Sequence, residues 1–124
     1  MSDVASRSRG RLIGLALAVL ALALGAQWWW TRSHQQFGSA VAALAKPGDI
    51  QIIVERNCEG CSIARAWMTQ YGVAFSECSI EADAECARVR RESGLKWMPL
   101  VRVRGELQEG FMPQRIYDRL RAKA

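Results

Sequence analysis

A short β-branched run leads directly into a pair of cysteines that opens a helical pattern. Residues 50–54, Ile-Gln-Ile-Ile-Val, predict a buried strand. Cys58 and Cys61 follow in a Cys-x-x-Cys spacing, and apolar residues then recur at helical spacing as far as Tyr71. At a helix start, unpaired N–H groups and the helix dipole stabilise a thiolate, and a cysteine one turn further on can attack a mixed disulfide. This placement predicts Cys58 as a nucleophile and Cys61 as its resolving partner.

The remaining pattern predicts a small α/β fold. The expected elements are a strand over 73–78, a weaker helix over about 82–93, a hairpin of strands over 100–103 and 106–109, and a last helix from about Pro113. Counted from the first strand, the order is therefore βαβαββα. Its first unit implies parallel strands with a right-handed crossover, and the hairpin adds antiparallel ones. We expect a four-stranded mixed sheet flanked by helices.

The N-terminal segment has the properties of a single membrane span. Residues 12–30 are almost entirely apolar and would form a helix of about 28 Å, close to the thickness of a hydrocarbon core. Three tryptophans at 28–30 suit the headgroup interface, and Arg7, Arg9 and Arg11 precede the run. We expect a cytoplasmic basic tail over 1–11, an anchor over 12–30, a linker over 31–47 and a folded domain over 48–124.

A cleaved signal peptide is the alternative for the same segment, because Gly25 and Ala26 follow a short apolar core. Under either reading the domain is exported. With the arginines on the cytoplasmic side, the expected location is the bacterial inner membrane with the C-terminal domain in the periplasm.

The charge distribution argues against nucleic acid as a partner. The formal net charge is +5, of which the first 46 residues carry +4. A nucleic-acid surface needs clustered positive charge on the folded domain itself. Arg88, Arg90 and Arg91 are interspersed with Glu85 and Glu92, which indicates a solvated helix face.

Two further cysteines leave several readings open. Cys78 and Cys86 fall at the end of a predicted strand and within the next helix. In an oxidising compartment they could form a structural disulfide, and buried free thiols or a second redox pair remain alternatives. A zinc site made of all four cysteines is disfavoured, because only Cys58 and Cys61 have the usual spacing, so no metal is expected.

Several segments resemble the glutaredoxins. The resemblance lies in residues 54–61 and 64–68, around the cysteine pair, and in residues 97–101, Trp-Met-Pro-Leu-Val. It implies that Pro99 is cis and faces the cysteines, and that Met98 offers backbone groups to an extended substrate or to glutathione. Residues 109–113, Glu-Gly-Phe-Met-Pro, resemble the Gly-Phe-x-Pro stretch of the glutaredoxin-like redoxins that serve ribonucleotide reductase. The substrate-binding residues implied by the likeness are Trp97, Met98, Pro99, Gly110 and Phe111.

The departures from that family bear on the partner. The central dipeptide is Glu59-Gly60 where glutaredoxins commonly have Pro-Tyr, and Met98 stands where they usually have Thr or Val. Glu109-Gly110 and Met112-Pro113 replace the Gly-Gly and acidic pair that hold glutathione. These changes count against glutathione, so we expect no cofactor beyond a redox-active disulfide.

Two functional hypotheses follow. The first is a membrane-tethered thiol–disulfide oxidoreductase acting on exported protein thiols. The redoxins that serve ribonucleotide reductase take electrons from thioredoxin reductase, a cytoplasmic enzyme that an exported domain cannot meet. The electron donor of this domain would therefore be another exported thiol protein or a membrane carrier. The second is a non-catalytic docking module in which the Cys58–Cys61 pair is a structural disulfide or a zinc site.

Overall fold

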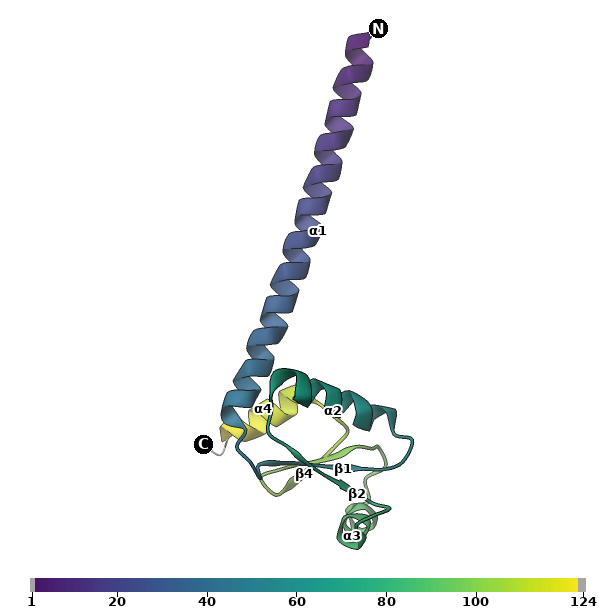
Figure 1. Ribbon diagram of the computed structural model, residues 1–124, viewed down its shortest axis with the longest axis vertical. Helices are drawn as coiled ribbons and strands as arrows, with labels where there is room; N and C mark the ends of the chain where they lie inside the picture. The colour runs from purple at the N-terminus through teal and green to yellow at the C-terminus, as the bar shows by residue number, and fades with distance from the viewer. Residues whose placement is uncertain (1, 123–124) are drawn as a thin grey trace. The chain divides into compact units, whose positions relative to one another are not determined.

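The computed structural model describes residues 2–122. After a long first helix, its order is βαβαββα, as the sequence predicts (Figure 1). The elements are α1 (Ser2–Leu44), β1 (Ile50–Val54), α2 (Glu59–Tyr71), β2 (Ser76–Ser79), α3 (Ala84–Ser93), β3 (Leu100–Val103), β4 (Glu106–Glu109) and α4 (Pro113–Ala122).

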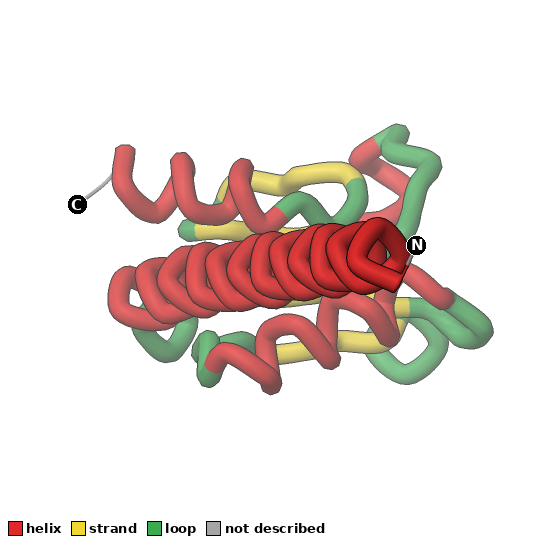
Figure 2. Tube along the Cα trace, turned by 90° about the horizontal axis from the view of Figure 1, so that it is seen from above, coloured by secondary structure: helices red, strands yellow, loops and turns green. Residues whose placement is uncertain are grey.

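The four strands form one mixed sheet in the order β2-β1-β3-β4. Strand β1 pairs with β2 in parallel and with β3 antiparallel, and β3 pairs with β4 antiparallel. Helices α2 and α4 cover one face of the sheet and α3 the other (Figure 1), and Figure 2 shows the helices of the first layer lying over the strands. The expected four-stranded mixed sheet flanked by helices is thereby confirmed.

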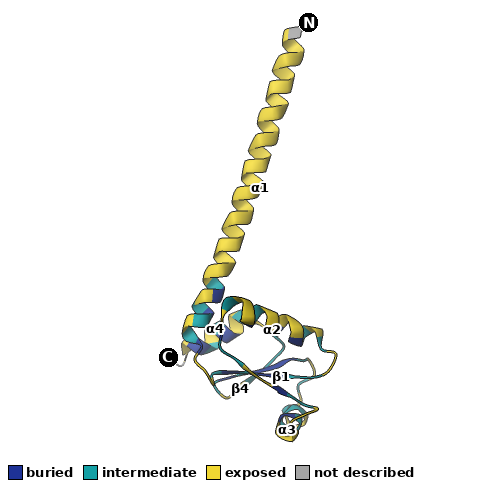
Figure 3. Cartoon of the chain, in the orientation of Figure 1, coloured by how far each residue is buried: buried dark blue, intermediate teal, exposed yellow. Residues whose placement is uncertain are grey.

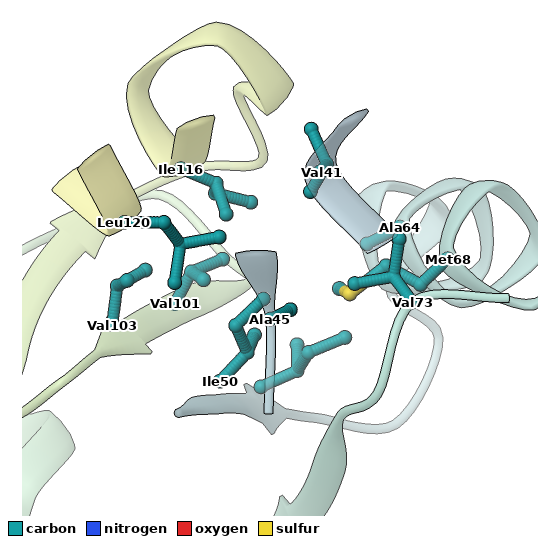
Figure 4. Close-up of a cluster of buried hydrophobic side chains, with 11 residues drawn as sticks. Val41, Ala45, Ile50, Ala64, Met68, Val73, Val101, Val103, Ile116 and Leu120 are labelled. Atoms are coloured by element: carbon teal, nitrogen blue, oxygen red, sulfur yellow. The ribbon is translucent and has the colours of Figure 1, made fainter. Parts of the chain in front are cut away.

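Two apolar clusters follow from the alternation of side chains along the strands. Ile50 of β1 lies in one buried cluster with Met68 of α2 and Ile116 of α4 (Figure 4). Ile52 belongs to the same cluster. Ile53 points the other way, toward α3. Burying one such branched side chain contributes about 1.5–3 kcal/mol, so β1 is held from both faces.

Two element boundaries differ from the sequence-based expectation. Strand β2 begins at Ser76 because Gly72 ends α2 in the left-handed region (φ 68°) and the amide of Val73 is used to cap the helix, donating to Met68 O at 2.9 Å. Helix α3 begins at Ala84 because the Asp83 carboxylate caps it, accepting from two backbone amides of its first turn.

The segment over 31–47, expected to be a linker, is helical as far as Leu44 and contributes residues to the core of the folded domain. The chain divides into two compact units, 1–35 and 36–124, and α1 continues to Leu44. From Gly38 onward the helix has buried residues (Figure 3), and Val41 and Ala45 belong to the main core cluster. The folded unit therefore starts at Gln36, because a Phe37, Val41, Ala45 spacing places one apolar helix face on the core.

The first unit covers residues 1–35. Its described residues are helical from Ser2 onward, and residues 3–35 are exposed. Among the described residues, one helix, Asp3–Leu44, is long and apolar enough to cross a membrane, and the span it offers is not buried. At the tryptophan end, the Arg32 guanidinium lies 5.0 Å from the Trp28 ring centroid. Trp30 packs on His34 with centroids 4.4 Å apart.

Candidate functional site

The cysteine pair lies at the start of α2, after the short loop that follows β1. Asn57 takes a left-handed backbone conformation (φ 59°), which turns the chain out of the strand. Cys58 is then the N-cap of α2, with an extended backbone, and its Sγ accepts a hydrogen bond from the Cys61 amide at 3.0 Å. An amide aimed at sulfur stabilises the negative charge of a thiolate more than a neutral thiol.

The two cysteines are joined by a disulfide and differ in access. Their Cα atoms are 5.2 Å apart. Cys61 is buried, with 2% of its surface exposed, whereas Cys58 is half-buried. An incoming sulfur can therefore reach Cys58 and not Cys61. This asymmetry is what a nucleophile with an internal resolving cysteine requires.

The second predicted motif, residues 97–101, lies against Gly60 in the cysteine pair's turn. A Cβ built on Gly60 would lie 3.1 Å from Met98 O and 3.1 Å from Pro99 Cδ. The Met98–Pro99 peptide bond is cis, and Pro99 is fully buried. The loop before β3 thus lies against the first turn of α2.

The third motif joins the same loop. The amide of Gly110 donates to Pro99 O at 2.9 Å, which places the end of β4 beside the proline. Phe111 packs on Trp67 with ring centroids 5.7 Å apart, in the main core cluster. Its side chain is thus a packing contact. Trp97 is 73% exposed and available to a partner.

Two residues for which the sequence predicted no role in the site hold this loop. The Glu109 carboxylate accepts from the amides of Lys96 (3.3 Å) and Trp97 (2.9 Å). The Arg90 guanidinium donates to the carbonyls of Leu95 and Lys96, the latter at 3.2 Å. The charges around Arg90 predicted a solvated helix face, but in the structure its side chain contacts the loop instead. The sequence carries no signal for this contact, since the helix has to be docked before it forms.

The loop before Cys58 is tied to the loop after β2. The Glu81 carboxylate accepts from the Ser79 hydroxyl at 2.6 Å and from the Arg56 amide at 2.7 Å. These hydrogen bonds lower the pKa of Glu81 below its usual value, and the bond from Ser79 has the larger effect. The carboxylate form therefore holds the turn from which Cys58 emerges.

Charges of both signs surround the pair. A cavity of about 320 Å³ is lined by Cys58, Cys61 and their neighbours, among them Glu55, Glu59 and Arg65. Arg65, however, pairs with Glu77 at 2.6 Å. Its charge is thereby partly neutralised, and the nearest hydrogen-bond donor to the Cys58 sulfur is the backbone of α2.

The second cysteine pair is a disulfide in the structure. Cys78 of β2 and Cys86 of α3 are joined, with Cα atoms 6.4 Å apart, and both are buried. Within the described part of the chain, no group of three or more His, Cys, Asp or Glu side chains is placed to hold a metal ion. The bridge attaches α3 to the sheet edge, on the face opposite α2.

Comparisons with known proteins agree with this geometry. No family model and no curated protein sequence matches the chain. The glutaredoxin-like NrdH-redoxin of Escherichia coli, a protein with a thioredoxin-like activity profile, superposes with a TM-score of 0.50 and 25% identity, over 56% of this chain and 91% of that one. A thioredoxin-like protein (TM-score 0.48, 22% identity, 56% and 97% covered) and the glutaredoxin of Archaeoglobus fulgidus (0.47, 18%, 59% and 86%) also match.

Fold and site together define a redox module of the thioredoxin fold, built around a Cys-x-x-Cys pair at the start of α2. Within that class, the chain is similar in fold to the glutaredoxin-like NrdH-redoxin of Escherichia coli, with which it shares 25% sequence identity.

Proposed function

We propose that this chain is a membrane-tethered thiol–disulfide oxidoreductase that exchanges disulfides with exported protein thiols through Cys58 and Cys61. The observation that carries the proposal is the asymmetry of the pair. Cys58 is accessible and its sulfur accepts the Cys61 amide, while Cys61 lies buried behind it.

The exchange runs in two steps. The Cys58 thiolate attacks one sulfur of a substrate disulfide, which forms a mixed disulfide and releases the other substrate sulfur as a thiolate. The Cys61 thiolate then attacks Cys58 Sγ, which closes the Cys58–Cys61 disulfide and releases the second substrate thiolate. Two electrons pass from the protein to the substrate, and the reverse sequence oxidises a substrate dithiol.

A polypeptide is the substrate class that we propose. Met98 is half-buried and lies against the first turn of α2, and the resemblance to glutaredoxins assigns its backbone to pairing with an extended chain. The exposed Trp97 ring supplies an apolar contact beside it. Glutathione is not part of the proposal, because Glu109 and Met112 occupy positions where glutathione-binding relatives have other residues. In this chain Glu109 binds backbone amides instead.

The proposed location is the bacterial inner membrane, with the domain in the periplasm. The apolar stretch of α1 is preceded by Arg7, Arg9 and Arg11, and the positive-inside rule assigns such residues to the cytoplasm. The buried Cys78–Cys86 disulfide fits an oxidising compartment. A retained anchor and a cleaved signal differ in one test: intact-mass measurement of the membrane-associated protein.

The deciding experiment is the reduction potential of the Cys58–Cys61 pair in the full-length chain. Thiol alkylation and mass spectrometry across a dithiol/disulfide buffer series should show a reversible transition at these two cysteines. A potential near about −270 mV indicates a reductant, and one near about −120 mV an oxidant. Cys61→Ser should accumulate a mixed disulfide through Cys58, and Cys58→Ser should not. A redox-inert pair would leave the docking module as the better account.

A further inference from the structure

The three residues before Met98 are held from both sides by side chains of opposite charge. On one side, the guanidinium of Arg90, from α3, donates to the carbonyls of Leu95 and Lys96. On the other side, the carboxylate of Glu109, from the end of β4, accepts from the amides of Lys96 and Trp97. We name this arrangement the Arg90–Glu109 clamp.

The burial of Arg90 indicates that its contacts are specific. Arg90 is half-buried, and its Nε atom is buried without a hydrogen-bond partner in residues 2–122. No carboxylate forms a salt bridge with it in that part of the chain. Placing a guanidinium in such a site is costly unless its remaining donors are satisfied, and here the acceptors are carbonyls of the loop.

Glu109 has the complementary role. One oxygen, Oε1, accepts both amides, and hydrogen bonds to a charged acceptor are stronger than those between neutral groups. Because Glu109 is the last residue of β4, opposite Leu100 in the sheet register, the clamp connects the loop to the sheet itself.

The clamped segment continues directly into the site. Trp97 leads into Met98 and the cis Pro99, and the Met98 carbonyl and the Pro99 ring lie against Gly60 inside the Cys-x-x-Cys turn. Met98 also packs on the second core cluster beneath α3. The position of the loop relative to Cys58 is thus set by the residues that hold Leu95 to Trp97.

We infer that Arg90 and Glu109 are positioning residues, which hold Trp97, Met98 and Pro99 in the conformation that receives a polypeptide substrate beside Cys58. This inference rests on the proposed function. Neither side chain bonds to the cysteine sulfurs in the structure, so the clamp should act on substrate binding and not on the sulfur chemistry.

The test compares a polypeptide disulfide with a small dithiol, on the full-length chain in detergent. Single-turnover reduction of insulin by the reduced protein gives a half-saturating concentration and a limiting rate. Reduction of the Cys58–Cys61 disulfide by dithiothreitol reports the sulfur chemistry alone. The variants are Glu109→Ala, Glu109→Gln, Arg90→Ala and Arg90→Lys. The matched control is Arg88→Ala, which removes exposed ion pairs with Glu85 and Glu92 on the same helix.

The clamp predicts a split between the two reactions. Glu109→Ala and Arg90→Ala should raise the half-saturating insulin concentration by about tenfold, the effect of losing one hydrogen bond to a charged group. The limiting rate and the dithiothreitol rate should stay within about twofold of wild type. Glu109→Gln, which keeps the accepting oxygen, should restore most of the loss, whereas Arg90→Lys should not, because lysine lacks the planar fork.

Three results would overturn the inference. Unchanged half-saturation in both alanine variants, an equal fall of the insulin and dithiothreitol rates, or the same defect in Arg88→Ala would each remove the positioning role. Hydrogen exchange distinguishes failure of the clamp from failure of the proposed oxidoreductase function. If the wild-type Cys58–Cys61 pair is redox-inert, the proposed function and the positioning role are both refuted. If wild type is active but the Lys96 and Trp97 amides stay equally protected in Glu109→Ala, the clamp alone is refuted.

Discussion

The backbone of Gly60 lies against the carbonyl of Met98, so that a Cβ on Gly60 would stand 3.1 Å from that oxygen. The contact joins the Cys-x-x-Cys turn to the cis-proline loop without any side chain between them. It gives a physical reason for glycine in the central dipeptide: a larger residue would push the loop away from Cys58.

Replacement of Gly60 tests this close approach. We predict that Gly60→Val destabilises the oxidised protein by about 1–3 kcal/mol, the usual cost of overpacking, and slows insulin reduction. Gly60→Ala should be milder, because the gain in helix propensity, about 1 kcal/mol, offsets part of the contact. Denaturant unfolding of each variant measures the difference.

The control for Gly60 is Ser62→Val, in the same helix at an exposed position. It introduces the same β-branched side chain without the neighbouring loop. If Gly60→Val lowers the unfolding free energy no more than Ser62→Val does, the contact with Met98 does not restrict the side chain at position 60.

The sequence was informative wherever one local pattern decided the structure. The strand over residues 50–54 and the helix after Cys58 follow from their own periodicity, and the structure has both. The sequence does not decide the pairing of Cys78 with Cys86, because the pairing depends on how α3 docks on the sheet. The contacts of Arg90 were missed for the same reason: a guanidinium reaching a carbonyl five residues away requires the loop to be folded back.

The start of the folded unit was missed for a different reason. Small residues between Ser39 and Ala45 are compatible with a flexible linker and with close helix packing. Which of the two forms depends on whether another part of the fold packs against this segment. In the structure Phe37 packs on Trp67 of α2 and on Tyr117 of α4, and Gly38 lies close to the Tyr71 ring.

Gly38 provides a second test. A Cβ there would overlap the Tyr71 ring at Cδ1. We predict that Gly38→Ala lowers the free energy of unfolding by about 1–3 kcal/mol, despite alanine's better helix propensity. Ser39→Ala, at the exposed neighbouring position, is the control. Equal stability of Gly38→Ala and Ser39→Ala in thermal unfolding would contradict the packing of residues 36–44 on α2.

Removal of the Cys78–Cys86 bridge should loosen α3. In the chain-entropy model, opening so short a loop costs about 2–3 kcal/mol. We therefore expect the double variant Cys78→Ala with Cys86→Ala to lose about that much stability, and the α3 amides to exchange faster than those of α2. In the buffer series that reduces Cys58 and Cys61, this buried pair should stay oxidised. Its reduction in the same potential range would make it a second redox pair.

The turn before Cys58 should respond to acid through Glu81. Its pKa is lowered, chiefly by the Ser79 hydroxyl and then by the Arg56 amide. A carboxylate whose folded pKa is depressed stabilises the fold above its unfolded pKa, here about 4.5, and the contribution is lost as the pH falls through the folded pKa. Protonation of Glu81 should therefore weaken its acceptance of the Arg56 amide hydrogen bond.

The measurement is an NMR titration of the Arg56 amide resonance between neutral and acid pH. We predict a titration with its midpoint below 4.5, the ordinary value for this carboxyl group, and a flat profile in Glu81→Gln, which keeps an accepting oxygen but has no proton to gain. A midpoint above that value, or an unchanged titration in Glu81→Gln, would show that another group controls the turn. Because Arg56 lies two residues before the nucleophile, the same titration reports whether the turn that presents Cys58 depends on this carboxylate.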